Sequence, residues 1–341
     1  MSGIMRAAVL RHPGPKNEKP LTVEERPVPE PGPGEVLLRV EACGVCRTDL
    51  HITMGELKPL RDEVTPGHQI VGLVEKLGGG DAAGLAIGQR VGVSWLGGVD
   101  GTCLLCRKGR ENLCDHPVFT GYTVNGGYAE YAVARADFCI PLPGEPKAEE
   151  LAPLLCAGIT VYSPMRTLGI NPASRVGVIG VGGLGHLALQ FARVFGAEVT
   201  AFSSSANKEE EALKLGAHHF VNSRESKAVN GLAGSFDLII STINADQDWP
   251  GYVNTLRPHG TLCFVGVAPK PIALPVFPLI GAMRSMCGSN IGSPSRITEM
   301  LDVAARHGVK AKVERFKMAD ANQALKRVRK SQVRYRAVLS N

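Results

Sequence analysis

The sequence contains no apolar stretch that approaches the roughly 20 residues of a membrane-spanning helix. Its N-terminus, MSGIMRAAVLRHPGP, has neither the apolar core nor the cleavage pattern of a secretory signal. It also has no internal repeat and no low-complexity segment. These absences argue against membrane, secreted and repeat proteins, and we expect a soluble, cytoplasmic protein.

A strong charge bias is also missing, because 38 basic and 32 acidic residues leave a formal net charge of only +6. The dense basic run consists of Lys326, Arg327, Arg329, Lys330, Arg334 and Arg336. Ala324, Leu325 and Val328 occupy the inward positions of an expected helix there, which predicts that the basic side chains form a solvated face. Tyr335 is the one aromatic residue within the run, which is too little aromatic interleaving for a nucleic-acid surface, so we expect no nucleic-acid partner.

The chain has 341 residues, of which 44% are hydrophobic, and this is enough for about two domains. Nine cysteines are present. In a reducing compartment they are expected to be thiols or metal ligands rather than a disulfide framework, and their spacing decides which.

A glycine-rich turn organises the middle of the chain. Residues 175–185 read RVGVIGVGGLG, an apolar strand that breaks at Gly180, Gly182 and Gly185 with G-x-G-x-x-G spacing. A helix over 186–195 follows and ends at Gly196, so its N-terminus points at the turn. The alternative is a plain structural turn, but the flanking strand and helix favour a dinucleotide site.

The sequence pattern changes near residue 152, which divides the chain into two regions. Residues 1–152 are rich in Gly and Pro, with alternating runs at 35–45, 70–78 and 128–134 that are typical of an irregular β domain. Residues 153–290 alternate strands with helices, which predicts a doubly wound parallel sheet. Expected elements there are strands at 199–203, 219–222, 237–242 and 261–267, and a helix at 208–215.

The C-terminal segment, 291–341, is expected to return to the first domain. It opens with Ser293 as N-cap and Pro294 at the first position of a helix that runs to about His307. Strand-like segments near Val313 and at 335–339 follow. The parallel sheet predicted for residues 153–290 is complete without them, so we expect them to pair in the first domain.

Three separate contexts carry a family resemblance: Cys46 in CGVCRTDLH, His68 in PGHQ and Cys156 in APLLCAGITVY. Together with GVGGLGH, they resemble the zinc-dependent medium-chain alcohol dehydrogenases over essentially the whole chain. The resemblance implies an α/β protein with a GroES-like irregular β catalytic domain and a Rossmann dinucleotide-binding domain. It also implies that Cys46, His68 and Cys156 hold a catalytic zinc with one open position, as such chemistry requires. Buried cysteines and a core histidine are the alternative.

By the same resemblance, Asp49 accepts a hydrogen bond from His68, and Thr48 and His51 form the proton path. Cys43, three residues before Cys46, is interpreted as a small buried residue, with a redox role as the alternative. Residues assigned to the cofactor are Arg47, Thr160, Gly180, Gly182, Gly183, Leu184 and Gly185. One departure matters: the family has Glu after the liganding histidine, and here the residue is Gln69. We expect slower product release without loss of the metal.

A second metal site is expected in CLLCRKGRENLC. Cys103, Cys106 and Cys114 match three of the four cysteines of the family's structural zinc lobe, and Asp100 stands where the fourth is expected. A carboxylate can ligate zinc, so we expect a closed site of one carboxylate and three thiolates. The alternative is a lobe that has lost its metal or is partly occupied.

The cofactor prediction depends on the second strand of the dinucleotide fold. That strand reads VTAFSSSANKEE and places Ser203 where NAD-specific relatives have an acidic residue. Ser203, Ser204, Ser205 and Lys208 suit a 2′-phosphate, and the stretch resembles the cinnamyl-alcohol-dehydrogenase-like branch, which uses NADP(H). The alternative is that the three serines only form a helix-entry turn.

The expected reaction is reversible hydride transfer between NADP(H) and an aldehyde or primary alcohol, with zinc as Lewis acid. An apolar or aromatic substrate is expected from the residues that match the cleft of relatives, Trp95, Leu96, Phe119 and Ile291. Relatives form dimers or tetramers, so we expect a homo-oligomer. Alternatives are an NAD-dependent dehydrogenase of short aliphatic alcohols and a non-catalytic zinc or thiol sensor of nucleotides. A zinc-free quinone reductase would lack the three zinc ligands.

Overall fold

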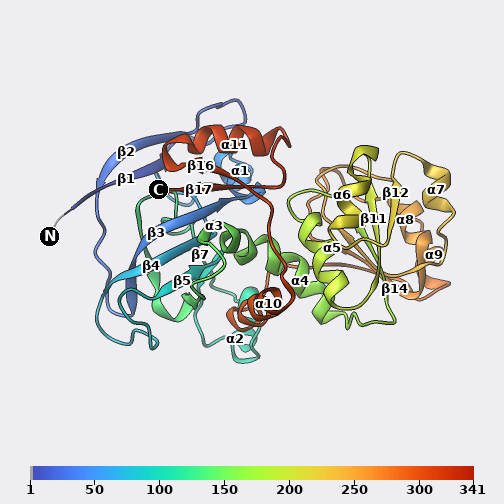
Figure 1. The fold of residues 1–341 in the computed structure, drawn as a ribbon, viewed down its shortest axis with the longest axis horizontal. Helices are drawn as coiled ribbons and strands as arrows, with labels where there is room; N and C mark the ends of the chain where they lie inside the picture. Colours follow the sequence, from blue (N-terminus) through green and yellow to red (C-terminus); the bar gives the residue numbers. More distant parts are fainter. Residues whose placement is uncertain (1–2) are drawn as a thin grey trace. The chain divides into compact units, whose positions relative to one another are not determined.

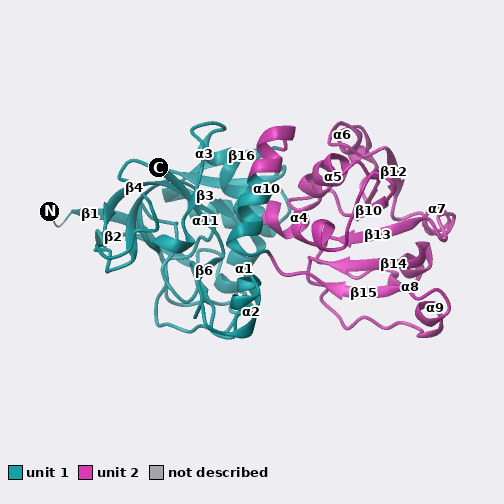
Figure 2. Cartoon of the chain, turned by 90° about the horizontal axis from the view of Figure 1, so that it is seen from below, with its two compact units in different colours: residues 1–156, 292–301, 310–341 teal, residues 157–291, 302–309 magenta. Residues whose placement is uncertain are grey.

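The computed structural model describes residues 3–341, so Met1 and Ser2 of the N-terminus discussed above lie outside the described residues. The chain divides into two compact units (Figure 2). Unit 1 extends to Cys156 and includes Gly292–Leu301 and Lys310–Asn341, whereas unit 2 comprises Ala157–Ile291 and Asp302–Val309. The first boundary therefore falls after Cys156 rather than residue 152, and residues 302–309 belong to unit 2.

Unit 1 is built on a sheet whose strands follow the order β16-β17-β3-β4-β5-β9, with β8 also pairing β3. Their bounds are β3 Glu35–Val45, β4 Ile70–Leu77, β5 Arg90–Val93, β8 Tyr131–Arg135, β9 Ile140–Pro141, β16 Val313–Lys317 and β17 Arg336–Ser340. The C-terminal β17 runs antiparallel to β3, with Leu339 opposite Cys43 (Figure 1). Apolar side chains from these strands form the core of the unit.

The other elements of unit 1 are short. Two antiparallel pairs are β1 (Ile4–Leu10) with β2 (Leu21–Pro27) and β6 (Leu96–Gly98) with β7 (Val118–Phe119). The α-helices are α1 Arg47–Thr53, α2 Leu104–Arg107, α3 Ala148–Leu151, α11 Ala321–Arg329 and α10 Pro294–His307, which ends in unit 2. Single 3₁₀ turns are η1 Glu111–Leu113, η2 Ala136–Phe138, η3 Ala152–Leu155 and η5 Met318–Asp320.

Unit 2 is the predicted doubly wound fold. Its parallel sheet has the order β12-β11-β10-β13-β14-β15. The strands are β10 Arg175–Ile179, β11 Glu198–Ser203, β12 His219–Asn222, β13 Phe236–Ser241, β14 Leu256–Phe264 and β15 Ser285–Gly288. The helices are α4 Ala157–Thr167, α5 Gly185–Val194, η4 Ala206–Lys208, α6 Glu209–Lys214, α7 Ser226–Asn230, α8 Trp249–Thr255 and α9 Phe277–Ile280.

The sheet of unit 2 positions a ligand site. Strand order reverses between β10 and β13, and in such sheets ligands bind beyond the carboxyl ends of the strands at this point. The glycine-rich turn follows β10 there. Two local details differ from the sequence prediction: the helix expected at 208–215 is divided into η4 and α6, and β14 already begins at Leu256. No helix among residues 3–341 is long and apolar enough to cross a membrane.

Candidate active site

Unit 1 brings together the three predicted ligands of the catalytic metal. Cys46 is the N-cap of α1, directly after β3, His68 precedes β4, and Cys156 follows η3. One ligand atom from each lies within 4.8 Å of the others, and all three residues are buried. The Cys46 and Cys156 sulfurs are 4.0 Å apart.

Hydrogen bonds orient these side chains. The His68 Nδ1–H donates to Asp49 Oδ1 at 3.0 Å, which leaves Nε2 as a donor atom for a metal. The other Asp49 oxygen accepts the backbone N–H of Cys46 at 2.7 Å. One buried carboxylate therefore positions two of the three predicted ligands.

The electrostatics suit a cation. A hydrogen bond from Cys156 lowers the pKa of the Cys46 thiol well below its ordinary value, against the effect of burial. Burial lowers the pKa of His68, but the charge and hydrogen bond of Asp49 together with those of Cys46 outweigh it and raise that pKa to about 10. Two sulfurs and one imidazole, buried and converging, are a donor set that fits zinc.

Helix α1 also carries the predicted proton path. The Thr48 hydroxyl oxygen accepts a hydrogen bond from the Cys46 thiol at 3.8 Å, so it lies beside the ligand cluster. His51, one turn further on, pairs through Nδ1 with the Glu56 carboxylate. The sequence analysis missed Glu56, although an acidic residue five positions after a histidine was a visible signal. Arg47 is exposed in the first turn of the helix.

Gln69 is hydrogen-bonded to Arg336, and the prediction for Arg336 was wrong. Arg336 was expected on a solvated basic face, but it is only 6% exposed and donates through Nη2 to Gln69 Oε1 at 3.0 Å. The Gln69 amide nitrogen lies 3.5 Å from His68 Nε2. The correction has a physical reason. Helix α11 ends at Arg329, so Arg336 does not belong to it. Arg336 instead begins strand β17, whose pairing with β3 carries it into the interior.

Aromatic rings lie beside the ligand cluster. Trp95 packs edge-on against His68, with ring centroids 5.2 Å apart, and stacks on Phe119 at 4.7 Å. Tyr122, which the sequence analysis missed, stacks on Trp95 at 6.0 Å. Trp95, Phe119 and Tyr122 are half-buried, whereas Leu96 is only 2% exposed and Ile291 belongs to unit 2.

The second predicted metal site also comes together. Asp100, Cys103, Cys106 and Cys114 each offer one atom within 4.8 Å of the others. Asp100 Oδ1 accepts the backbone N–H groups of Cys103 at 3.0 Å and Thr102 at 2.9 Å. These bonds lower the pKa of Asp100 to about 2, so the carboxylate is available as an anionic ligand.

Cys43 lies outside both clusters. Its side chain is fully buried in the core of unit 1, and burial raises the pKa of its thiol. A protonated, enclosed thiol is a poor nucleophile and a poor ligand. This environment favours the interpretation of Cys43 as a small packing residue.

In unit 2 the glycine-rich turn has the geometry of a dinucleotide site. Gly180 adopts φ +91°, and a Cβ at Gly185 would lie 1.7 Å from the Gly180 carbonyl oxygen, so both positions require glycine. Gly182 has no atom within 4 Å of where its Cβ would stand, which leaves room for a ligand against the backbone. Helix α5 begins at Gly185 and directs its N-terminus toward this turn.

The residues after β11 lie next to that turn. The Lys208 ammonium donates to the Val181 carbonyl at 2.6 Å, so this cation is held against the glycine-rich turn. Ser203 is buried, and its hydroxyl accepts the backbone N–H of Ser205 at 3.2 Å in a tight turn. Ser204 is exposed, and Thr160 is buried in α4.

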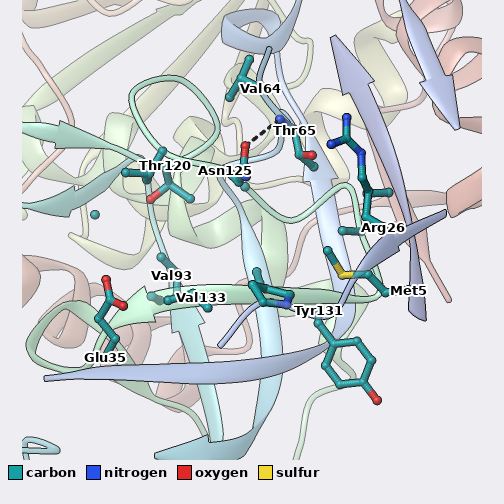
Figure 3. Close-up of a pocket in the computed structure, with 18 of the residues that line it drawn as sticks. Met5, Arg26, Glu35, Val64, Thr65, Val93, Thr120, Asn125, Tyr131 and Val133 are labelled. Atoms are coloured by element: carbon teal, nitrogen blue, oxygen red, sulfur yellow. Dashed lines mark hydrogen bonds between the residues drawn. The ribbon is translucent and has the colours of Figure 1, made fainter. Parts of the chain in front are cut away.

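A separate cavity lies under the β1–β2 hairpin of unit 1 (Figure 3). It has a volume of about 540 Å³ and includes Met5, Val93 and Val133 among its lining residues. The dashed bond in the figure joins the Thr65 backbone N–H to Asn125 Oδ1 at 3.1 Å. None of the predicted metal ligands or substrate residues lines this cavity, so it is distinct from the site around His68.

Comparisons with known proteins identify the family of this chain. The alcohol dehydrogenase GroES-like domain model matches residues 32–144, and the zinc-binding dehydrogenase model matches residues 183–306. An aldehyde reductase from Synechocystis sp. is 42% identical over 310 residues, which cover 91% of this chain and 92% of the relative. A cinnamyl alcohol dehydrogenase from Rauvolfia serpentina is 40% identical, with coverage of 90% and 88%.

Solved structures give the same result. A cinnamyl alcohol dehydrogenase from Sorghum bicolor superposes with a TM-score of 0.91 at 34% identity, covering 99% of this chain and 98% of that one. The structure of CAD from Helicobacter pylori, complexed with NADP(H), gives a TM-score of 0.87 at 28% identity, with coverage of 100% and 99%. This chain therefore belongs to the zinc-binding alcohol dehydrogenase family, and it is an oxidoreductase.

Proposed function

We propose that this protein is a zinc-dependent, NADP(H)-linked aldehyde reductase and alcohol dehydrogenase for apolar or aromatic substrates. The observation that carries the proposal is the stack of Trp95, Phe119 and Tyr122 against His68, one of the three converging metal-ligand residues. Such rings offer flat apolar faces on which an aromatic aldehyde can stack. The names of the relatives, aldehyde reductase and cinnamyl alcohol dehydrogenase, support this substrate class.

Cys46, His68 and Cys156 would hold the catalytic zinc. When bound, zinc supplies Lewis acidity toward the substrate oxygen and NADPH supplies the hydride. Asp49 fixes the orientation of His68 through the hydrogen bond to Nδ1. The remaining work of the chain is to position the substrate and to move one proton.

Thr48 and His51 would carry that proton. The Thr48 hydroxyl, beside the Cys46 sulfur, donates a hydrogen bond to the substrate oxygen and gives up its proton as the alcohol forms. His51 then returns a proton to this path. Glu56 accepts the Nδ1–H of His51. This bond fixes the tautomer with its proton on Nδ1, so that Nε2 is the nitrogen that takes part in the proton path.

NADP(H) would bind at the glycine-rich turn of unit 2. The pyrophosphate fits against Gly182 and the N-terminus of α5, with Gly183 and Leu184 completing the turn and Thr160 as a further contact. Lys208, held beside Val181, would pair with the 2′-phosphate, and the exposed Ser204 would add a hydroxyl. The NADP(H) complex of the H. pylori structure supports this choice.

A structural zinc bound by Asp100, Cys103, Cys106 and Cys114 completes the proposed metal content of two ions per chain. A homo-oligomer is also proposed, because β15 is the edge strand of its sheet and nearby apolar side chains are exposed. These are Val276 at 62%, Phe277 at 79%, Ile280 at 68% and Met283 at 66%. Thiolate ligands require reducing conditions, which suits a cytoplasmic location.

The test is oxidation of NADPH and of NADH by the purified, zinc-loaded protein with benzaldehyde, cinnamaldehyde and acetaldehyde. Preference for NADPH with the aromatic aldehydes is the expected result. Preference for NADH with acetaldehyde would instead assign a dehydrogenase of short aliphatic alcohols. Inactivity with every pair would favour a nucleotide-binding zinc or thiol sensor.

A variant connects this test to the aromatic rings. Trp95→Ala should raise the KM for benzaldehyde while leaving that for acetaldehyde nearly unchanged, because only the larger substrate uses the ring. Trp95→Phe keeps an aromatic face and serves as the matched control. An equal rise for both aldehydes would show that Trp95 only supports His68.

A further inference from the structure

The cavity under the β1–β2 hairpin of unit 1 is bounded by several strands (Figure 3). Strand β1 lines it with alternate residues, which share one face of that strand: Met5, Ala7 and Val9. Val133 and Arg135 line it from β8, where they also share a face. Its volume of about 540 Å³ lies within the roughly 300–1,000 Å³ of small-molecule sites, so the cavity is large enough for a ligand.

The charged side chains that line the cavity already have partners in the protein. Arg26 donates to Glu63 at 2.8 Å, and Arg135 pairs with Asp137 at 2.6 Å. Glu35 accepts a backbone N–H at 2.9 Å. The charged lining residues are two arginines and two glutamates, so their formal charges cancel. Because burying an unpaired charge is unfavourable, this lining fits a neutral molecule.

Polar side chains supply hydrogen-bond donors in the same cavity. Thr65, Thr120 and Asn125 line it, and both threonines are more than nine-tenths buried (Figure 3). Asn125 Oδ1 already accepts the Thr65 backbone N–H at 3.1 Å, which leaves the Asn125 Nδ2 amide as a donor. Across residues 3–341, neither this amide nor the two threonine hydroxyls hydrogen-bond another protein group. A ligand oxygen that accepts hydrogen bonds would satisfy them.

Strand β7 separates this cavity from the aromatic rings beside His68. Val118 lines the cavity, whereas the next residue, Phe119, stacks on Trp95. Neighbouring residues of a strand point to opposite faces, so the cavity and the aromatic stack lie on opposite sides of β7. The Thr120 backbone N–H donates to the Trp95 carbonyl at 2.9 Å, which holds the two sides together. A substitution can therefore fill one site and leave the other open.

We propose that this cavity is a second small-molecule site, which binds a neutral, largely apolar carbonyl compound. The carbonyl oxygen accepts hydrogen bonds from the Thr120 hydroxyl and the Asn125 amide. The hydrocarbon part packs against Met5, Val9 and Val133. The site uses no metal ligand and no residue of the glycine-rich turn, so it does not depend on the proposed reductase activity.

The experiment is titration of the zinc-loaded full chain with Prodan, a neutral naphthyl ketone whose fluorescence shifts to shorter wavelength in apolar surroundings. We expect saturable binding to the wild type. Val133→Phe fills the cavity and should weaken this binding at least about tenfold, whereas Trp95→Ala changes only the aromatic stack and should bind Prodan like the wild type. Absence of saturable binding, or a loss in Trp95→Ala as large as that in Val133→Phe, would overturn the proposal.

Thr120→Val tests the hydrogen bond without changing the shape of the side chain. It should weaken Prodan binding about fivefold and leave the displacement of Prodan by naphthalene, which has no oxygen, unchanged. Equal weakening of both ligands would contradict the role of the hydroxyl.

Val23→Phe is the matched control for Val133→Phe, because Val23 is exposed on β2 and does not line the cavity. It should bind Prodan like the wild type, and melting temperatures show whether both variants fold. The titration is repeated at a higher protein concentration. A loss of Prodan affinity there would assign the cavity to a contact between copies of the chain and overturn the proposal.

Discussion

Arg336 donates a hydrogen bond to Gln69 at 3.0 Å, and both side chains are buried next to the predicted ligand His68. The guanidinium therefore faces a neutral amide, although the family usually provides a carboxylate at this position. A buried cation without a matching anion makes the local potential more positive. A more positive potential should stabilise the bound anionic alkoxide and therefore slow release of the product.

Gln69→Glu tests this relationship. The new carboxylate should pair with Arg336 and remove one net positive charge near the substrate, so product release should become faster. An interaction of about 1 kcal/mol changes a rate roughly fivefold, and we expect kcat to rise by about this factor where release limits turnover. The measurement is steady-state and burst kinetics together with the zinc content, which should stay unchanged.

The control for Gln69→Glu is Gln332→Glu, which adds the same charge at an exposed position. It should leave kcat within experimental error. Unchanged kinetics in Gln69→Glu, or loss of zinc from it, would refute the proposed role of Gln69.

Asp100 should decide the occupancy of the second metal site. Wild-type protein is expected to contain two zinc ions per chain, and Asp100→Ala should contain one and melt at a lower temperature. Asp100→Cys restores the four-thiolate set and should keep both ions. Metal analysis of the three proteins is the measurement, and one zinc ion in the wild type would remove the site.

Lys208→Glu should reverse the cofactor preference. The substitution places a negative charge where the 2′-phosphate is proposed to bind, and hydrogen bonds to charged groups contribute about 1.5–3 kcal/mol. We therefore expect the KM for NADPH to rise at least about tenfold while the KM for NADH changes little. Lys214→Gln, a change on the exposed part of helix α6, is the control. Parallel changes for both cofactors would place Lys208 outside the phosphate site.

Thr48 should be required for proton transfer and dispensable for the metal. Thr48→Ala should lower kcat by about 10²–10⁴-fold, the usual contribution of a positioned proton donor. Thr48→Ser keeps a hydroxyl and should recover most of the activity. Zinc content and melting temperature are measured alongside, and an inactive Thr48→Ser with normal zinc would argue against the hydroxyl as donor.

Glu24 should make unit 1 sensitive to acid. Arg11 and then Arg26 lower its pKa from 4.5 to about 2 through hydrogen bonds, although desolvation opposes them. A carboxylate with a lowered folded-state pKa stabilises the fold above pH 4.5, and this contribution is lost as the pH falls toward 2. The melting temperature of Glu24→Gln should therefore fall less steeply between pH 5 and 3 than that of the wild type. Glu25→Gln, an exposed change on the same strand, should follow the wild-type curve.

The sequence was sufficient to predict the fold class and to identify most residues of the candidate site. Glycine spacing indicates a backbone path directly, because the turn at Gly180 and the close approach at Gly185 exclude side chains. Cysteine and histidine in their local contexts were also sufficient to select Cys46, His68 and Cys156 from a chain of 341 residues. Family resemblance supplied the grouping that spacing alone could not.

Only the tertiary structure showed what surrounds those residues. Arg336 appeared in the sequence as one of several basic residues, and strand β17 places it against Gln69, 267 positions earlier. Tyr122 stacks on Trp95 because of the path of its loop, which the local sequence pattern does not predict. Cys263 lies opposite Cys287 because of the register between strands β14 and β15. Ligand types and backbone turns are encoded locally by the chemistry of single residues. Neighbours across strands and loops are decided by long-range pairing and burial, which depend on the whole core.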